Sequence, residues 1–315
     1  MSRNHNYFEK NLRSHLQKFG GHHPWNEIYD YSLLPAGKYF RPELVIAVAA
    51  ENLSTKTIEE ELGKTNSPLS LLASLVEIHH TYTLIHDDMP CMDNDDFRRG
   101  RPSTHKKYGE WQALLAGDGL HGLSYRLLSE INHPNQSVLF KTMAHCLGPK
   151  GLILGQAMDL SGEMNLNHQS LKRTHLLKTG RLIQFSLMAS SLITPNYSYK
   201  RTLRLASLGE TLGIAFQFID DLSELSESLG EHEYGVNPWL NDNGEVALAT
   251  YQFLLRLDRD LQGPLRVVFA AYLCKMNEKI LGNEKEIREK LKSRKAHLEQ
   301  LKLIHPLLVK LSALE

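Results

Sequence analysis

Carboxylates and guanidiniums are concentrated in one short stretch of the chain, LIHDDMPCMDNDDFRRGRPSTH, which begins at Leu84. Its acidic residues include Asp87, Asp88 and Asp93, and Arg98 and Arg99 follow directly. Carboxylate oxygens are ligands that Mg²⁺ accepts, and an arginine can bind a phosphate through two parallel hydrogen bonds. These residue types therefore indicate a site that holds a divalent cation and a phosphate group together.

The spacing of these aspartates determines how the local chain must fold. Asp87 and Asp93 are six positions apart, which is about 240° on a straight helix, so they can share a site only if the helix ends between them. Pro90 provides that break. We therefore expect Asp87 and Asp88 at a helix C-terminus, where a bound cation relieves the unfavourable helix dipole, and Asp93 in a loop that curls back.

A second acidic cluster, at Asp220, Asp221 and Glu224, ends another long apolar stretch. Asp220 and Glu224 are four apart and lie on the same face of a helix. One acidic pair at a helix end is usually a solvated surface feature, but two such clusters favour a site. If the two helices pack side by side, the clusters face each other across an apolar channel, and a diphosphate could bridge them through Mg²⁺.

Three other places carry groups that could bind phosphate, although each is weak alone. Lys38 and Arg41, in GKYFRP, are three apart on one face of a helix start, and a solvated pair is the more common interpretation. Lys178 opens a helical run, and His80 lies on the helix that leads to the first acidic cluster. A single helical histidine is more often structural than functional.

Helical periodicity extends over nearly the whole chain, so the predicted fold class is all-α. Ser67 and Pro68 suit the N-cap and first position of a helix. The segments predicted to be helical are 68–87, 107–131, 135–147, 149–161, 168–177, 179–193, 199–229 and a resumed pattern from Glu245. No alternating strands and no linker are evident, which predicts a single domain over 1–315.

Composition limits the possible functions. Lys and Arg number 36, as do Asp and Glu, so the net charge of zero argues against nucleic acid as a partner. No apolar run reaches transmembrane length and the N-terminus lacks a signal-peptide core, which predicts a cytoplasmic protein without stable membrane insertion. The three cysteines have no metal-site spacing and are interpreted as reduced thiols.

Several motifs resemble those of the trans-isoprenyl diphosphate synthase family, of the bacterial farnesyl type. The first acidic stretch matches the DDxxxxD motif followed by RRGxP, and GKYFRP is similar to GGKxxRP with Ala36 in place of the first glycine. GQAMDL, KTG and FQFIDD match in order and spacing. The resemblance covers roughly residues 30–224 and implies a single-domain isoprenoid-synthase-like helical bundle around a central apolar cavity, with a divergent part from about 225.

The resemblance implies a reaction and its cofactor. An allylic diphosphate, dimethylallyl or geranyl, would ionise with the help of three Mg²⁺ ions and condense with isopentenyl diphosphate to give farnesyl diphosphate. The implied metal ligands are Asp87, Asp88 and Asp93 for two ions and Asp220 for the third. The catalytic set that the resemblance implies comprises Asp87, Asp88, Asp93, Lys178, Thr179, Gln217, Asp220 and Asp221.

Substrate-binding roles are also implied by the resemblance. Thr179 and Gln217 would stabilise the allylic cation with their oxygen dipoles, and Arg98 and Lys178 would bind the allylic diphosphate. The groups that would bind the diphosphate of isopentenyl diphosphate are Lys38, Arg41, His80 and Arg99. The family is usually homodimeric, so a homodimer is expected.

Product length would depend on the floor of the channel. In the family an aromatic residue five positions before the first motif is associated with short products, and Tyr82 holds that position, with Thr83 next. This favours a fifteen-carbon product. An alternative is that Tyr82 is a core residue, because straight-helix geometry places Thr83 most directly beneath Asp87.

The chain departs from the family pattern after the second motif. Glu224 replaces an aspartate, and no lysine occurs between Lys200 and Lys275. One hypothesis is an enzyme with a weaker hold on the allylic diphosphate, and another is a non-catalytic partner subunit that binds prenyl diphosphates. A geranylgeranyl or longer-chain synthase is the nearest competing enzyme, while a terpene cyclase and a metal-dependent nuclease or phosphatase explain the residues less well.

Overall fold

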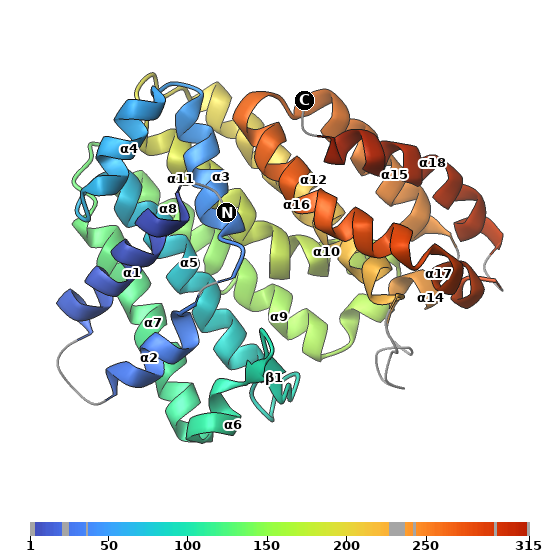
Figure 1. The fold of residues 1–315 in the computed structure, drawn as a ribbon, viewed down its shortest axis with the longest axis horizontal. Coiled ribbons are helices and arrows are strands. Elements are labelled where there is room, and N and C mark those ends of the chain that lie inside the picture. The colour runs from blue at the N-terminus through green and yellow to red at the C-terminus, as the bar shows by residue number, and fades with distance from the viewer. Residues whose placement is uncertain are drawn as a thin grey trace. The chain divides into compact units, whose positions relative to one another are not determined.

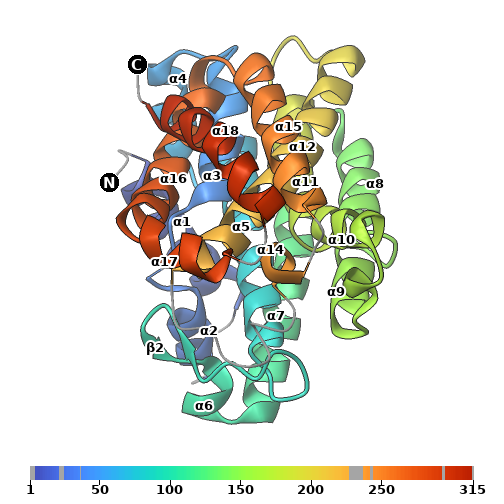
Figure 2. The ribbon, with the colours of Figure 1, turned by 90° about the vertical axis from the view of Figure 1, so that its right-hand side faces the viewer.

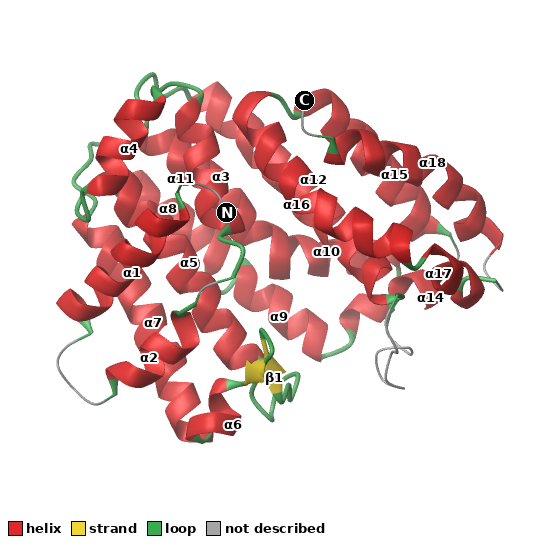
Figure 3. Ribbon diagram, viewed as in Figure 1, coloured by secondary structure: helices red, strands yellow, loops and turns green. Residues whose placement is uncertain are grey.

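The computed structural model describes residues 4–20, 25–35, 37–226, 237–241, 244–292 and 295–313. Within them the regular secondary structure is helical apart from one two-stranded hairpin, which confirms the predicted all-α class (Figures 1 and 3). Backbone contacts group the chain into two compact units, Met1–Thr142 with Ser186–Tyr199, and Met143–Phe185 with Lys200–Glu315. A single domain over 1–315 stays a prediction, and each unit is considered separately.

The first unit is built around a central helix, α5. Its elements are α1 (His5–Phe19), α2 (Asn26–Leu33), α3 (Phe40–Ala50), α4 (Thr55–Gly63), α5 (Pro68–Asp87), β1 (Phe97–Arg98), β2 (Arg101–Pro102), α6 (Thr104–Tyr108), α7 (Glu110–Glu130), the first part of α8 (Gln136–Leu147) and most of α11 (Arg181–Ile193). Helices α5 and α7 run side by side in both views (Figures 1 and 2).

Helix α5 carries the first acidic motif at its C-terminal end, and its start is fixed by a cap. The Ser67 Oγ accepts a hydrogen bond from the Ser70 N–H at 3.1 Å, and Pro68 stands at the first helical position, as the sequence predicts. Most of the side chains of α5 are buried, including Leu72 and Val76 at 0 % exposure. Such a helix, apolar on nearly every face, is a fixed support for the residues at its end.

The second unit holds the second acidic motif at the end of its longest helix, α12. Its elements are α9 (Leu152–Leu160), η1 (Glu163–Asn165), α10 (His168–His175), the π-helical turn η2 (Leu176–Gly180), α12 (Tyr199–Glu224), α14 (Pro238–Asn241), α15 (Glu245–Asp260), α16 (Gly263–Gly282), α17 (Glu284–Lys290) and α18 (Lys295–Ser312). Helix α18 packs on α15 and α16.

The predicted helices are present, with shifted ends. Helix α7 begins at Glu110 rather than 107, because Gly109 adopts φ 107°, a backbone conformation that α-helices exclude. Helix α12 ends at Glu224, and residues 227–229 of the predicted segment lie outside the described residues. No helix among the described residues is long and apolar enough to span a membrane.

Two backbone contacts in the second unit require glycine. A Cβ atom on Gly213 of α12 would lie 2.2 Å from the Gly180 Cα, and one on Gly155 of α9 would lie 2.2 Å from the Lys178 backbone nitrogen. Helices α9 and α12 therefore both approach the π-helical turn η2 at backbone distance. This approach fixes where residues 178 and 179 stand.

Protonation of a buried histidine in α1 is expected to make the fold sensitive to acid. His15 is 2 % exposed, and burial lowers its pKa to about 4, with the Lys18 charge acting in the same direction. The unfolded chain binds a proton near pH 6.5 and the folded chain does not, so stability is present above that pH and is lost as the pH falls. Between pH 7 and 5 this loss amounts to about 2 kcal/mol.

We therefore expect His15→Leu to reduce the loss of unfolding free energy between pH 7 and 5 by about 2 kcal/mol. Urea denaturation at the two pH values measures the difference. His145→Leu, at an exposed position of α8, is the matched control and should leave the loss unchanged. An equal acid sensitivity of His15→Leu and the parent protein would show that His15 does not cause it.

Candidate functional site

The first acidic motif adopts the backbone arrangement that its spacing predicts. Helix α5 ends at Asp87, and Asp88 is its C-cap. The Asp93 N–H donates a hydrogen bond to the Asp87 carbonyl oxygen at 2.9 Å, so the loop curls back to the helix end. Asp87 is half-buried and Asp93 is exposed, which leaves both carboxylates in a position to meet a ligand.

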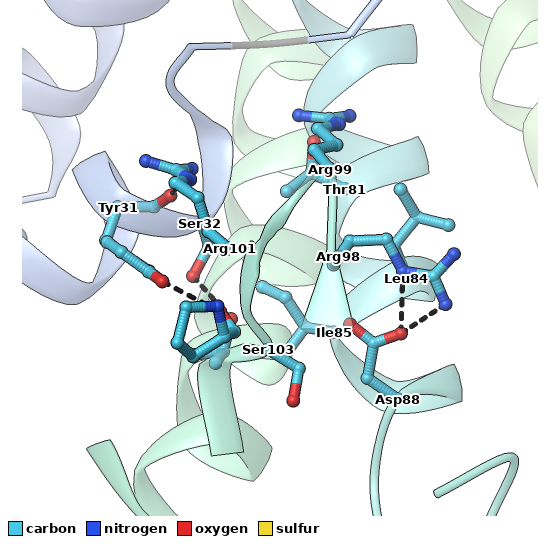
Figure 4. A pocket seen from close by; sticks show the side chains of 12 residues that line it. Tyr31, Ser32, Thr81, Leu84, Ile85, Asp88, Arg98, Arg99, Arg101 and Ser103 are labelled. Atoms are coloured by element: carbon cyan, nitrogen blue, oxygen red, sulfur yellow. Dashed lines mark hydrogen bonds and ion pairs between the residues drawn. The ribbon is translucent and has the colours of Figure 1, made fainter. Parts of the chain in front are cut away.

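Asp88 differs from its neighbour, because its carboxylate holds an arginine. It is 2 % exposed, and its Oδ1 accepts hydrogen bonds from the Arg98 Nε at 2.8 Å and from Arg98 Nη2 (Figure 4). Arg98 Nη2 also donates to Asp95 Oδ2 at 2.6 Å. Burial raises the pKa of Asp88, and the Arg98 guanidinium opposes that shift. Asp88 thus fixes the direction of Arg98, while its predicted role as a metal ligand stays a prediction.

The hairpin β1–β2 separates the two adjacent arginines. Arg98 pairs with Arg101 across the ladder, and the turn between them contains Arg99 at φ 55° and Gly100 at φ 74°. Two consecutive positive φ angles are typical of a type I′ turn, which matches the twist of a hairpin. The turn directs Arg98 to Asp88 and directs Arg99 to a different set of partners.

Arg99 lies against the loop that precedes α3. Its Nη1 donates to the Pro35 carbonyl oxygen at 3.3 Å, and a Cβ on Gly37 would lie 3.3 Å from its Nη2. Tyr39, at φ 52°, connects this loop to α3, where Arg41 stands in the first turn. The structure therefore brings the GKYFRP and RRG motifs together, with the exposed Lys38 in the same loop.

His80 is close to the charges of three arginines. Burial lowers its pKa well below the ordinary value, and Arg41, Arg99 and Arg98 lower it further. The predicted group formed by Arg41, His80 and Arg99 is thus gathered at one place in the first unit. Its neighbour Glu77, one helical turn earlier, is a residue that the sequence analysis missed. The available signal was an acidic side chain on an otherwise apolar stretch of α5.

The residues predicted to set product length face different surroundings. Tyr82 is 5 % exposed and packs edge-on against His79, at 4.5 Å between ring centroids, and against His121 of α7, at 4.7 Å. Thr83 is half-buried, and its Oγ1 donates to the His80 carbonyl oxygen at 2.8 Å. Tyr82 therefore packs against α7, and a role for either residue in product length stays a prediction.

In the second unit, the π-helical turn η2 presents Lys178 and Thr179. Lys178 Nζ forms an ion pair with Asp159 Oδ2 on α9. Thr179 Oγ1 donates to the Gln217 Oε1 at 3.0 Å. The sequence predicts an ordinary helix from 179, whereas the structure has a wider turn over Leu176–Gly180, at the place where α12 approaches closely through Gly213.

The second acidic motif continues this network along α12. Gln217 Nε2 donates to Asp221 Oδ1 at 2.8 Å, and His175 Nε2 lies 3.8 Å from Asp221 Oδ2. Asp221 is 5 % exposed, and burial raises its pKa well above the ordinary value, as does the Glu224 charge. Burial lowers the pKa of His175 to about 3, so this imidazole is neutral.

A pocket in the second unit gathers most of the residues predicted there. Its lining includes Asp159, Lys178, Thr179, Gln217, Asp221 and Glu224. Asp220, directly before Asp221 on α12, is half-buried. The predicted face-to-face placement of the two acidic motifs stays a prediction, because the motifs belong to different units.

The donor set of the two motifs fits Mg²⁺ that arrives together with a diphosphate. Among the described residues, no group of three or more His, Cys, Asp or Glu side chains could hold an ion by itself. Mg²⁺ usually takes one or two carboxylates and completes its shell with phosphate oxygens and water. The accessible carboxylates of Asp87, Asp93 and Asp220 suit that mode of binding, and Glu224 offers another oxygen donor.

Comparison with known proteins gives consistent matches. The family model for polyprenyl synthetase matches residues 22–234. A farnesyl diphosphate synthase of Geobacillus stearothermophilus is 35 % identical over 255 residues, covering 79 % of this chain and 81 % of that protein. The large subunit 1 of a chloroplastic heterodimeric geranylgeranyl pyrophosphate synthase of Arabidopsis thaliana is 36 % identical over 216 residues, covering 65 % of this chain and 55 % of that protein.

Solved structures agree with this result. A geranyltransferase from Legionella pneumophila superposes with a TM-score of 0.66 at 26 % identity, covering 92 % of this chain and 96 % of that one. The geranyltransferase of Helicobacter pylori, complexed with magnesium and isoprenyl diphosphate, gives a TM-score of 0.62 at 26 % identity, covering 95 % and 99 %.

Proposed function

The chain belongs to the polyprenyl synthetase family and is a prenyltransferase, and from that premise we propose that it makes farnesyl diphosphate. The substrates would be isopentenyl diphosphate and an allylic diphosphate, dimethylallyl or geranyl. The observation that carries the proposal is that each unit holds a partly exposed cation in an ion pair with a carboxylate next to its acidic motif, Arg98 with Asp88 in the first and Lys178 with Asp159 in the second.

The residues present can perform the separate parts of such a reaction. Arg98 and Lys178 would bind the allylic diphosphate, each with its direction set by a carboxylate. Magnesium held by Asp87, Asp93 and Asp220 would supply Lewis-acid stabilisation of the leaving diphosphate. As the C–O bond breaks, positive charge develops on the allylic carbon.

Thr179 and Gln217 would stabilise that charge, and two hydrogen bonds support this role. The Thr179 hydroxyl proton is donated to Gln217 Oε1, so the lone pairs of Thr179 Oγ1 are directed elsewhere. The Gln217 amide is itself held by Asp221, which fixes its oxygen relative to the hydroxyl. Preoriented oxygen dipoles of this kind stabilise a developing cation without having to reorganise.

The finer points of the assignment belong to the same proposal. Three Mg²⁺ ions per site is proposed on the family resemblance. A homodimer is supported by an apolar strip on α7, where Trp111, Leu114 and Leu115 are 60 %, 47 % and 49 % exposed. Location in the cytoplasm stays a prediction.

The proposal is tested by incubating the purified chain with Mg²⁺, radiolabelled isopentenyl diphosphate and geranyl diphosphate, followed by chain-length analysis. We expect a fifteen-carbon product that disappears when EDTA removes the metal. A product of twenty carbons or more would favour the geranylgeranyl or longer-chain alternative. Unconsumed label with dimethylallyl, geranyl and farnesyl starters alike would overturn the enzyme and favour a non-catalytic partner subunit.

A further inference from the structure

A buried carboxylate lies behind the cations of the first unit. Glu77 on α5 is 3 % exposed, and its Oε1 is 3.9 Å from Arg99 Nη2. Burial raises the pKa of Glu77, and the charges of Arg99 and Arg41 act against that shift. A carboxylate this deeply buried requires cationic neighbours, so Glu77 and the two arginines depend on each other.

Arg99 is held from two sides. On one side its guanidinium touches Glu77, and on the other it meets the Pro35 carbonyl oxygen and the backbone of Gly37. The Arg99 side chain remains 24 % exposed, whereas the side chain of Glu77 is only 3 % exposed. A ligand can therefore reach the arginine, while the carboxylate stays behind it.

Several positive charges lie close together around Glu77, and the Glu77 carboxylate reduces the repulsion between them. The pKa of His80 is lowered by Arg41, Arg99 and Arg98 together, which shows that their charges converge. Guanidiniums gathered in this way repel one another, and a single carboxylate among them reduces that cost. Without it, Arg41 and Arg99 would be expected to move apart toward solvent.

We propose that Glu77 is a positioning residue that holds Arg99 and Arg41 in the arrangement that binds the diphosphate of isopentenyl diphosphate. Glu77 makes no contact with the substrate and takes no part in bond making. It acts by fixing the direction of the Arg99 guanidinium through their ion pair and by offsetting the charge of Arg41, so that less ordering remains to be done when the diphosphate arrives. The inference rests on the proposed function for the identity of that ligand.

The test is Glu77→Gln, with the Michaelis constants of the two substrates measured separately. We expect KM for isopentenyl diphosphate to rise about 10- to 100-fold, with KM for geranyl diphosphate and kcat within about twofold. Glu60→Gln, at a 58 % exposed side chain of α4, is the matched control and should change neither constant. In the double variant Glu77→Gln/Arg99→Gln, the rise in KM should be smaller than the product of the two single-variant factors, because the two residues act in part through the same contact.

Three results would contradict the inference: an unchanged KM in Glu77→Gln, a fall in kcat alone, or equal losses for both substrates. If Glu77→Gln does not fold, Glu77→Asp replaces it, and it should raise the same KM by a smaller factor. If the unaltered chain has no activity, the proposed function fails. The inference about Glu77 is then tested by calorimetric measurement of isopentenyl diphosphate binding. Glu77→Gln should bind it more weakly than the parent chain does, and equal affinities would overturn the inference.

Discussion

Replacing Asp87 with asparagine is expected to lower kcat at saturating Mg²⁺ by about 30- to 1000-fold, which corresponds to about 2–4 kcal/mol of transition-state stabilisation. Asp87 is half-buried at the last position of α5, where the helix dipole disfavours a negative charge. The Asp87 charge also attracts the Arg98 guanidinium, so its removal should change the free energy of unfolding by less than about 1 kcal/mol. Product formation across a Mg²⁺ titration, together with urea denaturation, measures both effects.

Asp88→Asn provides a matched comparison at the next residue. Because Asp88 is buried and anchors Arg98, its replacement should cost about 1–3 kcal/mol of stability. A measurement independent of turnover is the rise in melting temperature that Mg²⁺ and inorganic diphosphate together produce. Asp87→Asn should abolish this rise. A variant Asp87→Asn that retains both this rise and full kcat would remove Asp87 from the metal site.

The second large effect is expected at Lys178. Its replacement by alanine should lower kcat/KM for the allylic diphosphate about 10- to 100-fold, because one hydrogen bond to a charged group is worth about 1.5–3 kcal/mol. The sequence contains no lysine between Lys200 and Lys275, so in the proposed site Lys178 would bind the allylic diphosphate without the further lysine that the family pattern provides. KM for isopentenyl diphosphate should change by no more than about twofold.

Lys200→Ala is the control for Lys178→Ala, because Lys200 is exposed in the first turn of α12. It removes the same charge from the same unit and should leave both kinetic constants unaltered. Steady-state rates with geranyl diphosphate as the varied substrate measure the difference. If Lys178→Ala loses affinity for both diphosphates equally, its effect is general and the proposed allylic role is wrong.

The parts of this structure that depend on local chemistry could be predicted from the sequence. Ser67 and Pro68 specify the start of α5, and the spacing of Asp87 and Asp93 around Pro90 specifies its end. Both follow from rules that involve only residues a few positions apart. The succession of helices along the chain could also be predicted, because each helix has its own apolar periodicity.

The side-chain partners within the site could not be predicted in this way. Glu77 meets Arg99 across 22 positions of the sequence, and Lys178 meets Asp159 across 19, so no local pattern connects them. The π-helical turn at Lys178 is another such case, because it lies at a glycine contact with α12, which is distant in the sequence. Tertiary packing determines these features, and sequence periodicity carries no information about it.

In the proposed function, the carboxylate partners of Arg98 and Lys178 would affect how quickly a product departs. A diphosphate that binds Arg98 or Lys178 must compete with Asp88 or Asp159 for the same cation. After the reaction, the carboxylate would still lie beside the cation and could form the ion pair again. Competition of this kind lowers the affinity for the diphosphate and raises the rate at which the diphosphate dissociates. We therefore expect the inorganic diphosphate formed in the proposed reaction to leave the site quickly.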